Sequence, residues 1–269
     1  MKIVTLYIEN DFAQLQQLRM LLKSILVSQK QPEIIVLCNK IPRLGFTEDA
    51  PDFLKMIKFI EIVPHKGAKP VQEAYLQKLH ITQYVEPPFI FIDADSIVSG
   101  EIPATGMDIC VNSTEYVGEV YYGLKVTDIK KMFGLKGNLI YFNSGTVLVN
   151  NDNGKELYDL ALQFKQKHDL WEEDEPYLVC ALTKLREDGG IKVKYMDYMS
   201  TAWDLYEPLG NPDKKVIHHY HCSKAVPVES KLIARLRQVN RDFEDKFPGL
   251  VYPIPAPAVG DETSKGSMI

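Results

Sequence analysis

Two carboxylates one residue apart, Asp93 and Asp95, are well suited to bind a metal ion. They directly follow four apolar residues, Phe89 to Ile92, and an unalternated apolar run this short is typical of a buried parallel strand. In open α/β sheets, ligands bind beyond the carboxyl ends of the strands. Two neighbouring negative charges beside a core are costly without a positive partner. We therefore expect a divalent cation that holds a phosphate here; a plain acidic turn in solvent is the alternative.

Three histidines within four positions, His218, His219 and His221, form a second group with metal-binding chemistry. With Cys222 they could form a zinc site. Consecutive strand residues point to opposite faces, however, so the three imidazoles cannot all reach one ion without distortion. One histidine that joins Asp93 and Asp95 is the simpler geometry, and two carboxylates, one imidazole and phosphate oxygens suit Mn²⁺ better than zinc. The residues alone leave open which histidine it is.

Alternating apolar runs and amphipathic stretches must position these groups. Short buried strands are predicted at 3–7, 34–38, 56–63, 89–92, 107–111, 191–195 and 215–220, and helices at about 71–84, 127–133, 154–168 and 231–247. A first helix follows Asp11 and Gln14, which match a capping box. This alternation implies an α/β fold with a mixed, mostly parallel central sheet flanked by helices. A GxGxxG fingerprint after the first strand is absent, so the dinucleotide-binding form of such a sheet is not predicted.

Two further segments combine polar groups with strand or helix signals. In LIYFNSGTVLVN, residues 139–150, two apolar runs flank Asn143-Ser144-Gly145, and Gly145 predicts a bend or a close approach of the backbone to a ligand. Asp174 is placed as the N-cap of a helix whose first turn holds Pro176. The region 115–137 is rich in glycine and tyrosine and is read as a loop-rich excursion that contains the short helix at 127–133. Residues 249–269 are Pro-rich, then polar, and are expected to form a flexible tail.

Composition limits the partners and the compartment. The net charge is -5 and no stretch concentrates Lys and Arg, which argues against nucleic acid as a partner. The four cysteines are far apart, as is typical of free thiols in a reducing compartment. The N-terminus turns polar too early for a signal peptide, and no run approaches the ~20 apolar residues of a membrane span. We therefore expect a cytoplasmic protein without a transmembrane segment, and a homodimer is compatible with the sequence.

Four motifs in order resemble those of the GT-A glycosyltransferases, and most closely family 8, the glycogenin and lipopolysaccharide galactosyltransferase group. They are KLHI through Tyr84 from residue 78, FIDADSIV at 91–98, YFNSGTVLVN at 141–150 and VIHHYHCSK at 216–224. The resemblance covers roughly residues 1–225 and implies a nucleotide-diphospho-sugar transferase fold. It implies a single GT-A domain over 1–248, with a nucleotide-binding half at 1–98 and a half for donor sugar and acceptor at 99–248.

The resemblance also implies roles for individual residues. In the last motif the metal-binding histidine lies six residues before a lysine, so Lys224 selects His218 as the third ligand of Mn²⁺ beside Asp93 and Asp95, with Mg²⁺ as the alternative ion. The implied catalytic residues are Lys78, Asp174 and Glu175. Glu175 stands where the family usually has an amide. The remaining implied contacts to the nucleotide-sugar are Thr5, Leu6, Tyr7, Asn10, Ala94, Asn143, Ser144 and Lys224.

The resemblance therefore implies transfer of a sugar from a nucleotide-sugar, a UDP-hexose, to a hydroxyl acceptor with retention of anomeric configuration. The acceptor is a saccharide, a lipid-linked sugar or a protein hydroxyl, and segment 116–141 is the candidate acceptor side. Two alternatives stay open. One is a sugar-nucleotide-binding protein without turnover. The other is a phosphatase in which the first Asp after a buried strand is the nucleophile, although that pattern normally opens a chain and needs a later acidic pair.

Overall fold

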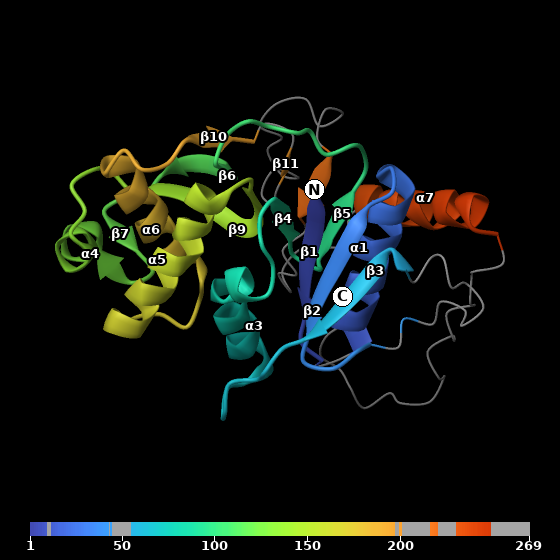
Figure 1. Ribbon diagram of the computed structural model, residues 1–269, viewed down its shortest axis with the longest axis horizontal. Coiled ribbons are helices and arrows are strands. Elements are labelled where there is room, and N and C mark those ends of the chain that lie inside the picture. The colour runs from blue at the N-terminus through green and yellow to red at the C-terminus, as the bar shows by residue number, and fades with distance from the viewer. Residues whose placement is uncertain are drawn as a thin grey trace.

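The computed structural model describes residues 1–9, 12–42, 44, 55–196, 199–200, 216–219 and 230–248. Its centre is a seven-stranded sheet in the order β10-β6-β9-β4-β1-β2-β3 (Figure 1). The strands are β1 (Lys2–Tyr7), β2 (Glu33–Cys38), β3 (Ile57–Glu61), β4 (Phe89–Ile92), β6 (Ile109–Tyr116), β9 (Ile140–Val149) and β10 (Val193–Tyr195). Strands β4, β1, β2 and β3 are parallel, and β9 runs antiparallel to both of its neighbours. The predicted mixed, mostly parallel sheet is confirmed.

Two smaller sheets flank the central one. The first contains β11 (Met199–Ser200), β12 (Ile217–His219) and β5 (Ser96–Val98), and the second is a hairpin of β7 (Val120–Tyr121) and β8 (Leu124–Lys125). Neither β5 nor the hairpin was predicted, because strands of two or three residues are too short for a visible period. Strand β12 pairs antiparallel with β5, so that His219 lies opposite Ser96 and His218 opposite Ile97. This pairing joins the histidine segment to the residues that directly follow Asp95.

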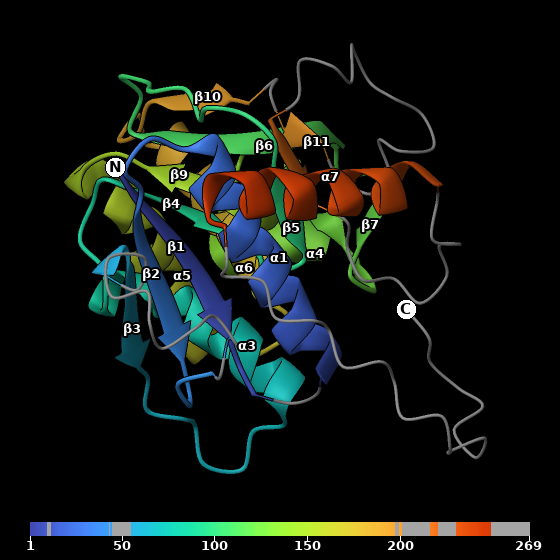
Figure 2. The same cartoon turned by 90° about the vertical axis from the view of Figure 1, so that its right-hand side faces the viewer.

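Helices cover both faces of the central sheet. On one face lie α1 (Phe12–Ser28) and α7 (Ser230–Lys246), side by side in both views (Figures 1 and 2). On the other lie α3 (Pro70–Leu79), α5 (Asp152–His168) and α6 (Glu175–Glu187), and α4 (Val126–Phe133) follows the hairpin. The predicted helix at 71–84 ends at Leu79, and a separate 3₁₀ turn occupies Ile81–Gln83.

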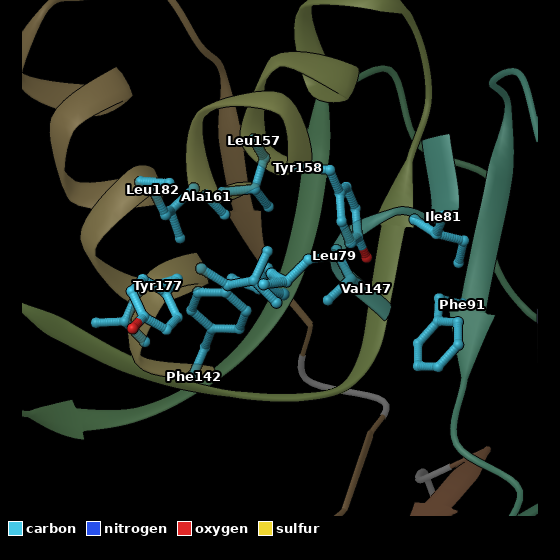
Figure 3. Packing of buried hydrophobic residues seen from close by; sticks show 14 of the residues in the cluster. Leu79, Ile81, Phe91, Phe142, Val147, Leu157, Tyr158, Ala161, Tyr177 and Leu182 are labelled. Carbon is cyan, nitrogen blue, oxygen red and sulfur yellow. The ribbon is translucent and has the colours of Figure 1, made fainter. Parts of the chain in front are cut away.

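The strands supply one hydrophobic core to each face of the sheet because their side chains alternate. In β4, Phe89 and Phe91 pack toward α5 and α6, whereas Ile90 and Ile92 pack toward α1. Figure 3 shows the first of these cores, where Tyr158 of α5 lies above Val147 of β9 and Tyr177 of α6 lies beside Phe142. All four residues of β4 are buried, as expected for a short strand with apolar side chains on both faces.

Strand β9 contains a bulge at its centre. Its pairing with β6 jumps from Val111 opposite Val147 to Asn112 opposite Asn143, so residues 144–146 have no register partner in β6. A bulge re-aims the side chains around it. The sequence predicted two apolar runs around a bend, and the structure shows one continuous strand that carries this irregularity. The predicted strand at 107–111 likewise continues as β6 to Tyr116.

Candidate metal and donor site

Asp93 and Asp95 follow the carboxyl end of β4, and β12 brings His219 to them. The Nε2 atom of His219 lies 3.0 Å from Oδ1 of Asp95 and 3.7 Å from Oδ2 of Asp93. Each of the three residues offers one ligand atom, and these atoms all lie within 4.8 Å of one another. Two carboxylate oxygens and an imidazole nitrogen form a donor set that suits a divalent cation such as Mn²⁺.

The structure places His219, and not the expected His218, beside the two carboxylates. His218, which the spacing to Lys224 selected, points to the opposite face of β12, where its Nε2 lies 3.0 Å from Oγ of Ser99. The cause is the alternation of side chains along a strand, which sends His218 and His219 to opposite faces. The pairing of β12 with β5 then decides which of them faces Asp95. Lys224 and His221 lie outside the described residues.

The imidazole of His219 is held from its other side by β9. Its Nδ1 lies 2.9 Å from Oδ1 of Asn143, an oxygen that also accepts a hydrogen bond from the Gly145 amide at 2.9 Å. A histidine that binds a metal through one nitrogen usually donates the other N–H to such an oxygen, which sets its tautomer and orientation. Burial alone would lower the pKa of His219, but the carboxylates of Asp95 and Asp93 outweigh it and raise that pKa.

Gly145 leaves room for these side chains. A Cβ atom at this position would lie 2.3 Å from Cε1 of His219 and 2.7 Å from Oδ2 of Asp93. Gly145 also accepts a hydrogen bond from the Asp93 amide at 2.8 Å through its carbonyl oxygen. The structure shows a close approach of the Asp93 and His219 side chains to the bare backbone at Gly145. An approach of this backbone to a bound ligand stays a prediction.

Lys78, from the last turn of α3, lies on the other side of Asp93. Its Nζ is 3.1 Å from Oδ1 of Asp93, 3.6 Å from Oδ2 of Asp174 and 3.4 Å from Oγ of Ser144. Lys78 is buried, and burial lowers the pKa of an ammonium group. The charges of Asp174 and Asp93 outweigh this effect and raise the pKa of Lys78 well above its ordinary value, so the ammonium stays charged.

Asp174 and Glu175 begin α6 and are both buried. Asp174 occupies the predicted N-cap position, but its side chain makes no capping hydrogen bond and instead faces Lys78. Burial raises its pKa, and the charge of Lys78 opposes this rise. Glu175 accepts hydrogen bonds from the Ser144 amide at 3.3 Å and from the Tyr122 hydroxyl at 3.1 Å. Burial, followed by the charge of Asp174, raises the pKa of Glu175 to about 7.

The residues expected around the nucleotide lie on β1 and in the turn after β4. Thr5 and Tyr7 are buried, Leu6 and Ala94 are half-buried, and Asn10 lies outside the described residues. The Thr5 hydroxyl is shielded from solvent and has no hydrogen-bond partner among the residues that the structure describes. The structure thus brings Lys78, Asp93, Asp95, Ser144, Asp174 and Glu175 into one network and replaces His218 by His219.

The tyrosines around Glu175 are the part of the site that motif reasoning did not assign individually. Tyr122 and Tyr141 both direct their hydroxyls at the Glu175 carboxylate, with Tyr141 at 3.4 Å from Oε2. The richness of segment 116–141 in tyrosine was a signal for a surface, but the hairpin turn that aims Tyr122 was not visible in the sequence.

None of the described helices is long and apolar enough to cross a membrane.

Comparison with known protein families finds no match, and comparison with curated proteins by sequence finds none either. Solved structures do match. The galactosyltransferase LgtC in complex with donor and acceptor sugar analogues has a TM-score of 0.61 at 15% identity, over 91% of this chain and 96% of that one. The glycosyltransferase GlyE of Streptococcus pneumoniae has a TM-score of 0.56 at 16% identity, over 95% of this chain and 66% of that one.

A third solved structure, mouse xyloside xylosyltransferase 1, has a TM-score of 0.51 at 15% identity, over 84% of this chain and 99% of that one. All three similar proteins are glycosyltransferases. They share with this chain the mixed sheet and its flanking helices, and the resemblance of the four motifs to GT-A enzymes is confirmed at the level of the fold. The chain therefore has the GT-A glycosyltransferase fold.

Proposed function

We propose that this chain is a metal-dependent glycosyltransferase that moves a sugar from a nucleotide-sugar, a UDP-hexose, to a hydroxyl acceptor with retention of configuration. The observation that carries the proposal is the convergence of Asp93, Asp95 and His219 at the carboxyl end of β4, where an open α/β sheet binds its ligands. The GT-A fold supports it, because all three similar structures reported above are glycosyltransferases.

The residues present fit a divalent cation. Asp93, Asp95 and His219 would hold it, Asn143 would orient His219, and Gly145 leaves the space that both ligand side chains need. When bound, Mn²⁺, or Mg²⁺ in its place, supplies positive charge that neutralises the leaving diphosphate.

The chain's own residues would position the donor. Lys78 carries a buried positive charge beside Asp93, which limits the repulsion between the carboxylates and an incoming diphosphate. Ser144 and Asp174 lie within reach of Lys78 and are proposed to contact donor-sugar hydroxyls, together with Glu175. Leu6, Thr5 and Tyr7 of β1, with Asn10, are proposed to border the base and ribose, and Lys224 is proposed as a further contact to the leaving group.

A panel of nucleotide-sugars tests the proposal. UDP-glucose, UDP-galactose, UDP-N-acetylglucosamine, UDP-xylose and GDP-mannose are each incubated with the protein in EDTA, Mn²⁺ or Mg²⁺, and nucleotide release and thermal stabilisation are measured. We expect Mn²⁺-dependent release of UDP. Thermal stabilisation by a nucleotide-sugar without any release would favour a binding protein instead. Release of inorganic phosphate from p-nitrophenyl phosphate, tested in a separate reaction, would favour a phosphatase.

Two neighbouring histidines provide a matched pair of variants for the metal assignment. Loss of the hydrogen-bond partner of a metal ligand costs about 10–100-fold in affinity or activity, and loss of the ligand itself should cost at least as much. His219→Asn should therefore lower Mn²⁺-dependent UDP release by about 10–100-fold or more. His218→Asn, on the opposite face of β12 beside Ser99, should retain most of the wild-type rate. The reverse order of the two rates would restore His218 as the ligand and contradict the geometry.

A further inference from the structure

The hairpin of β7 and β8 presents one tyrosine in an unusual way. Its turn residues Tyr122 and Gly123 both have positive φ, at 46° and 79°. Two successive left-handed residues form the hairpin turn that matches the twist of the strands, and Asn, Asp and Gly are the usual residues there. A bulky residue such as Tyr is a conformational outlier at positive φ. Strain of this kind is retained where the surroundings hold it in place, and it clusters at ligand sites.

Three contacts hold Tyr122 in this conformation. Its hydroxyl donates to Oε1 of Glu175 at 3.1 Å, and its carbonyl oxygen accepts a hydrogen bond from Nε1 of Trp171 at 3.2 Å. The ring of Tyr121 meets its ring edge-on, with centroids 4.9 Å apart. Glu175, Trp171 and Tyr121 are themselves buried, so the anchors are fixed in the core. Tyr122 as a whole residue nevertheless remains 41% exposed.

Tyr122 is connected to the candidate metal site by a short series of polar contacts. Glu175 accepts from the Ser144 amide, and Nζ of Lys78 contacts both the Ser144 hydroxyl and Asp93. Ser144 and Asp174 are at most 5% exposed, so they line the inner end of this series. The partly exposed Tyr122 is its outer end. The strand β7, which directly precedes Tyr122, lies on the side of the molecule away from β1 and β2 (Figure 1). A ligand that arrives from solvent after the donor has bound would meet this ring.

On these grounds we propose that Tyr122 is the acceptor platform, a rigid ring on which a saccharide acceptor lies with its hydroxyls toward Glu175. The inference rests on the proposed function and deepens it. A tyrosine held at its hydroxyl offers apolar contact area at little cost in conformational entropy. A sugar ring matches it, because one of its faces is made of C–H groups while its rim carries hydroxyls. The carboxylate at the edge of the ring supplies acceptor oxygens for those hydroxyls.

Two substitutions at Tyr122 separate the ring from its hydroxyl. Tyr122→Asn removes the ring but suits the positive φ of the turn, and Tyr122→Phe keeps the ring and removes the hydrogen bond to Glu175. The probes are the p-nitrophenyl β-glycosides of glucose, galactose and N-acetylglucosamine. Their binding is followed by saturation-transfer NMR, and transfer to them is measured relative to donor hydrolysis in the same reaction. Tyr195→Thr is the control, because Tyr195 has similar exposure and its hydroxyl accepts from Arg186 on another part of the surface.

Loss of an aromatic anchor typically costs at least tenfold in affinity. Tyr122→Asn should therefore lower glycoside binding and the ratio of transfer to donor hydrolysis by about tenfold or more. Tyr122→Phe keeps the ring and loses one of its three anchors, so it should lose clearly less than Tyr122→Asn, while Tyr195→Thr stays near the wild type. An unchanged ratio in Tyr122→Asn would overturn the inference, as would an equal loss in Tyr122→Phe. A wild-type protein without UDP release contradicts the proposed function alone, since glycoside binding still tests Tyr122. A wild-type protein that binds none of the three glycosides contradicts the platform.

Discussion

Asp93 contacts both the lysine side and the histidine side of the candidate site. Lys78 contacts it from α3 and His219 approaches it from β12, so one carboxylate faces a permanent cation and a candidate metal position at once. Such an arrangement is stable only if the charges balance, because buried charges without partners are costly. The buried pairing with Lys78 therefore gives Asp93 a fixed orientation before a metal or donor is bound.

Glu175 provides a prediction for the pH dependence of stability. Its pKa is raised from an ordinary 4.5 to about 7, chiefly by burial. The folded protein thus keeps this proton over a range where the unfolded chain has lost it, so its stabilising contribution is complete below pH ~4.5 and is lost as the pH rises through about 7. In EDTA, the free energy of unfolding of the wild type relative to Glu175→Gln should fall by about 3 kcal/mol from pH ~4.5 to pH ~8.

Urea unfolding at several pH values measures this difference. Glu156→Gln is the control, because Glu156 is exposed on α5 and its replacement should leave the pH trend of the wild type intact. A wild-type protein and a Glu175→Gln variant with parallel pH profiles would show that the pKa of Glu175 is the same in the folded and the unfolded protein, in contradiction to the effect of its burial.

At the scale of single elements, β9 determines how the candidate metal site is assembled. Its bulge at 144–146 lets Asn143 orient His219 while Gly145 contacts Asp93 through its backbone. The same short segment presents Ser144 to Lys78 and Glu175. A regular strand would send alternate residues to opposite faces throughout. The irregularity therefore gives one strand contacts to both the metal ligands and the lysine network.

A methyl group at Gly145 tests this role of the strand. Gly145→Ala places a Cβ within 2.3 Å of the His219 ring and 2.7 Å of the Asp93 carboxylate, so at least one candidate ligand must move. We expect Mn²⁺ affinity, measured by electron paramagnetic resonance titration, to fall by about 10–100-fold. Gly106→Ala is the matched control, since a Cβ there meets nothing within 4 Å. Equal affinities in the two variants would mean that His219 and Asp93 do not bind the ion.

At the scale of the whole molecule, the central sheet crosses the boundary between the two predicted halves. Strand β4 from the first half pairs directly with β9 from the second, and α7 from the end of the described chain packs against α1, with Phe243 fully buried. Shared sheets and cores favour cooperative unfolding. These contacts support the proposal that residues 1–248 form a single domain.

Unfolding by urea should accordingly show one transition. Both tryptophans, Trp171 and Trp203, belong to the second half, so their fluorescence reports on it alone. Amide hydrogen exchange of peptides from β1 and β2, followed by mass spectrometry, reports on the first half. The two midpoints should coincide. Exchange of β1 and β2 at a lower urea concentration than the change in fluorescence would instead identify the halves as separate cooperative units.

The sequence by itself determined the local chemistry of this protein. A run of four buried apolar residues before Asp93 and Asp95, and a glycine between apolar runs at Gly145, can be recognised without tertiary structure, because burial and backbone freedom leave local patterns. The alternation of apolar runs and amphipathic stretches predicted the α/β sheet, and the resemblance of four ordered motifs to a known family implied the GT-A fold. Short strands such as β5 and the hairpin that aims Tyr122 left no such pattern.

Only the tertiary structure decided which side chains meet. His218 and His219 are neighbours in an apolar strand, and a shift of one residue in the pairing with β5 would exchange their faces. That register depends on contacts with residues more than a hundred positions away, which no local spacing encodes. The same holds for Lys78 between Asp93 and Asp174 and for Tyr122 against Glu175, because each pair is joined by the folding of separate elements onto one sheet.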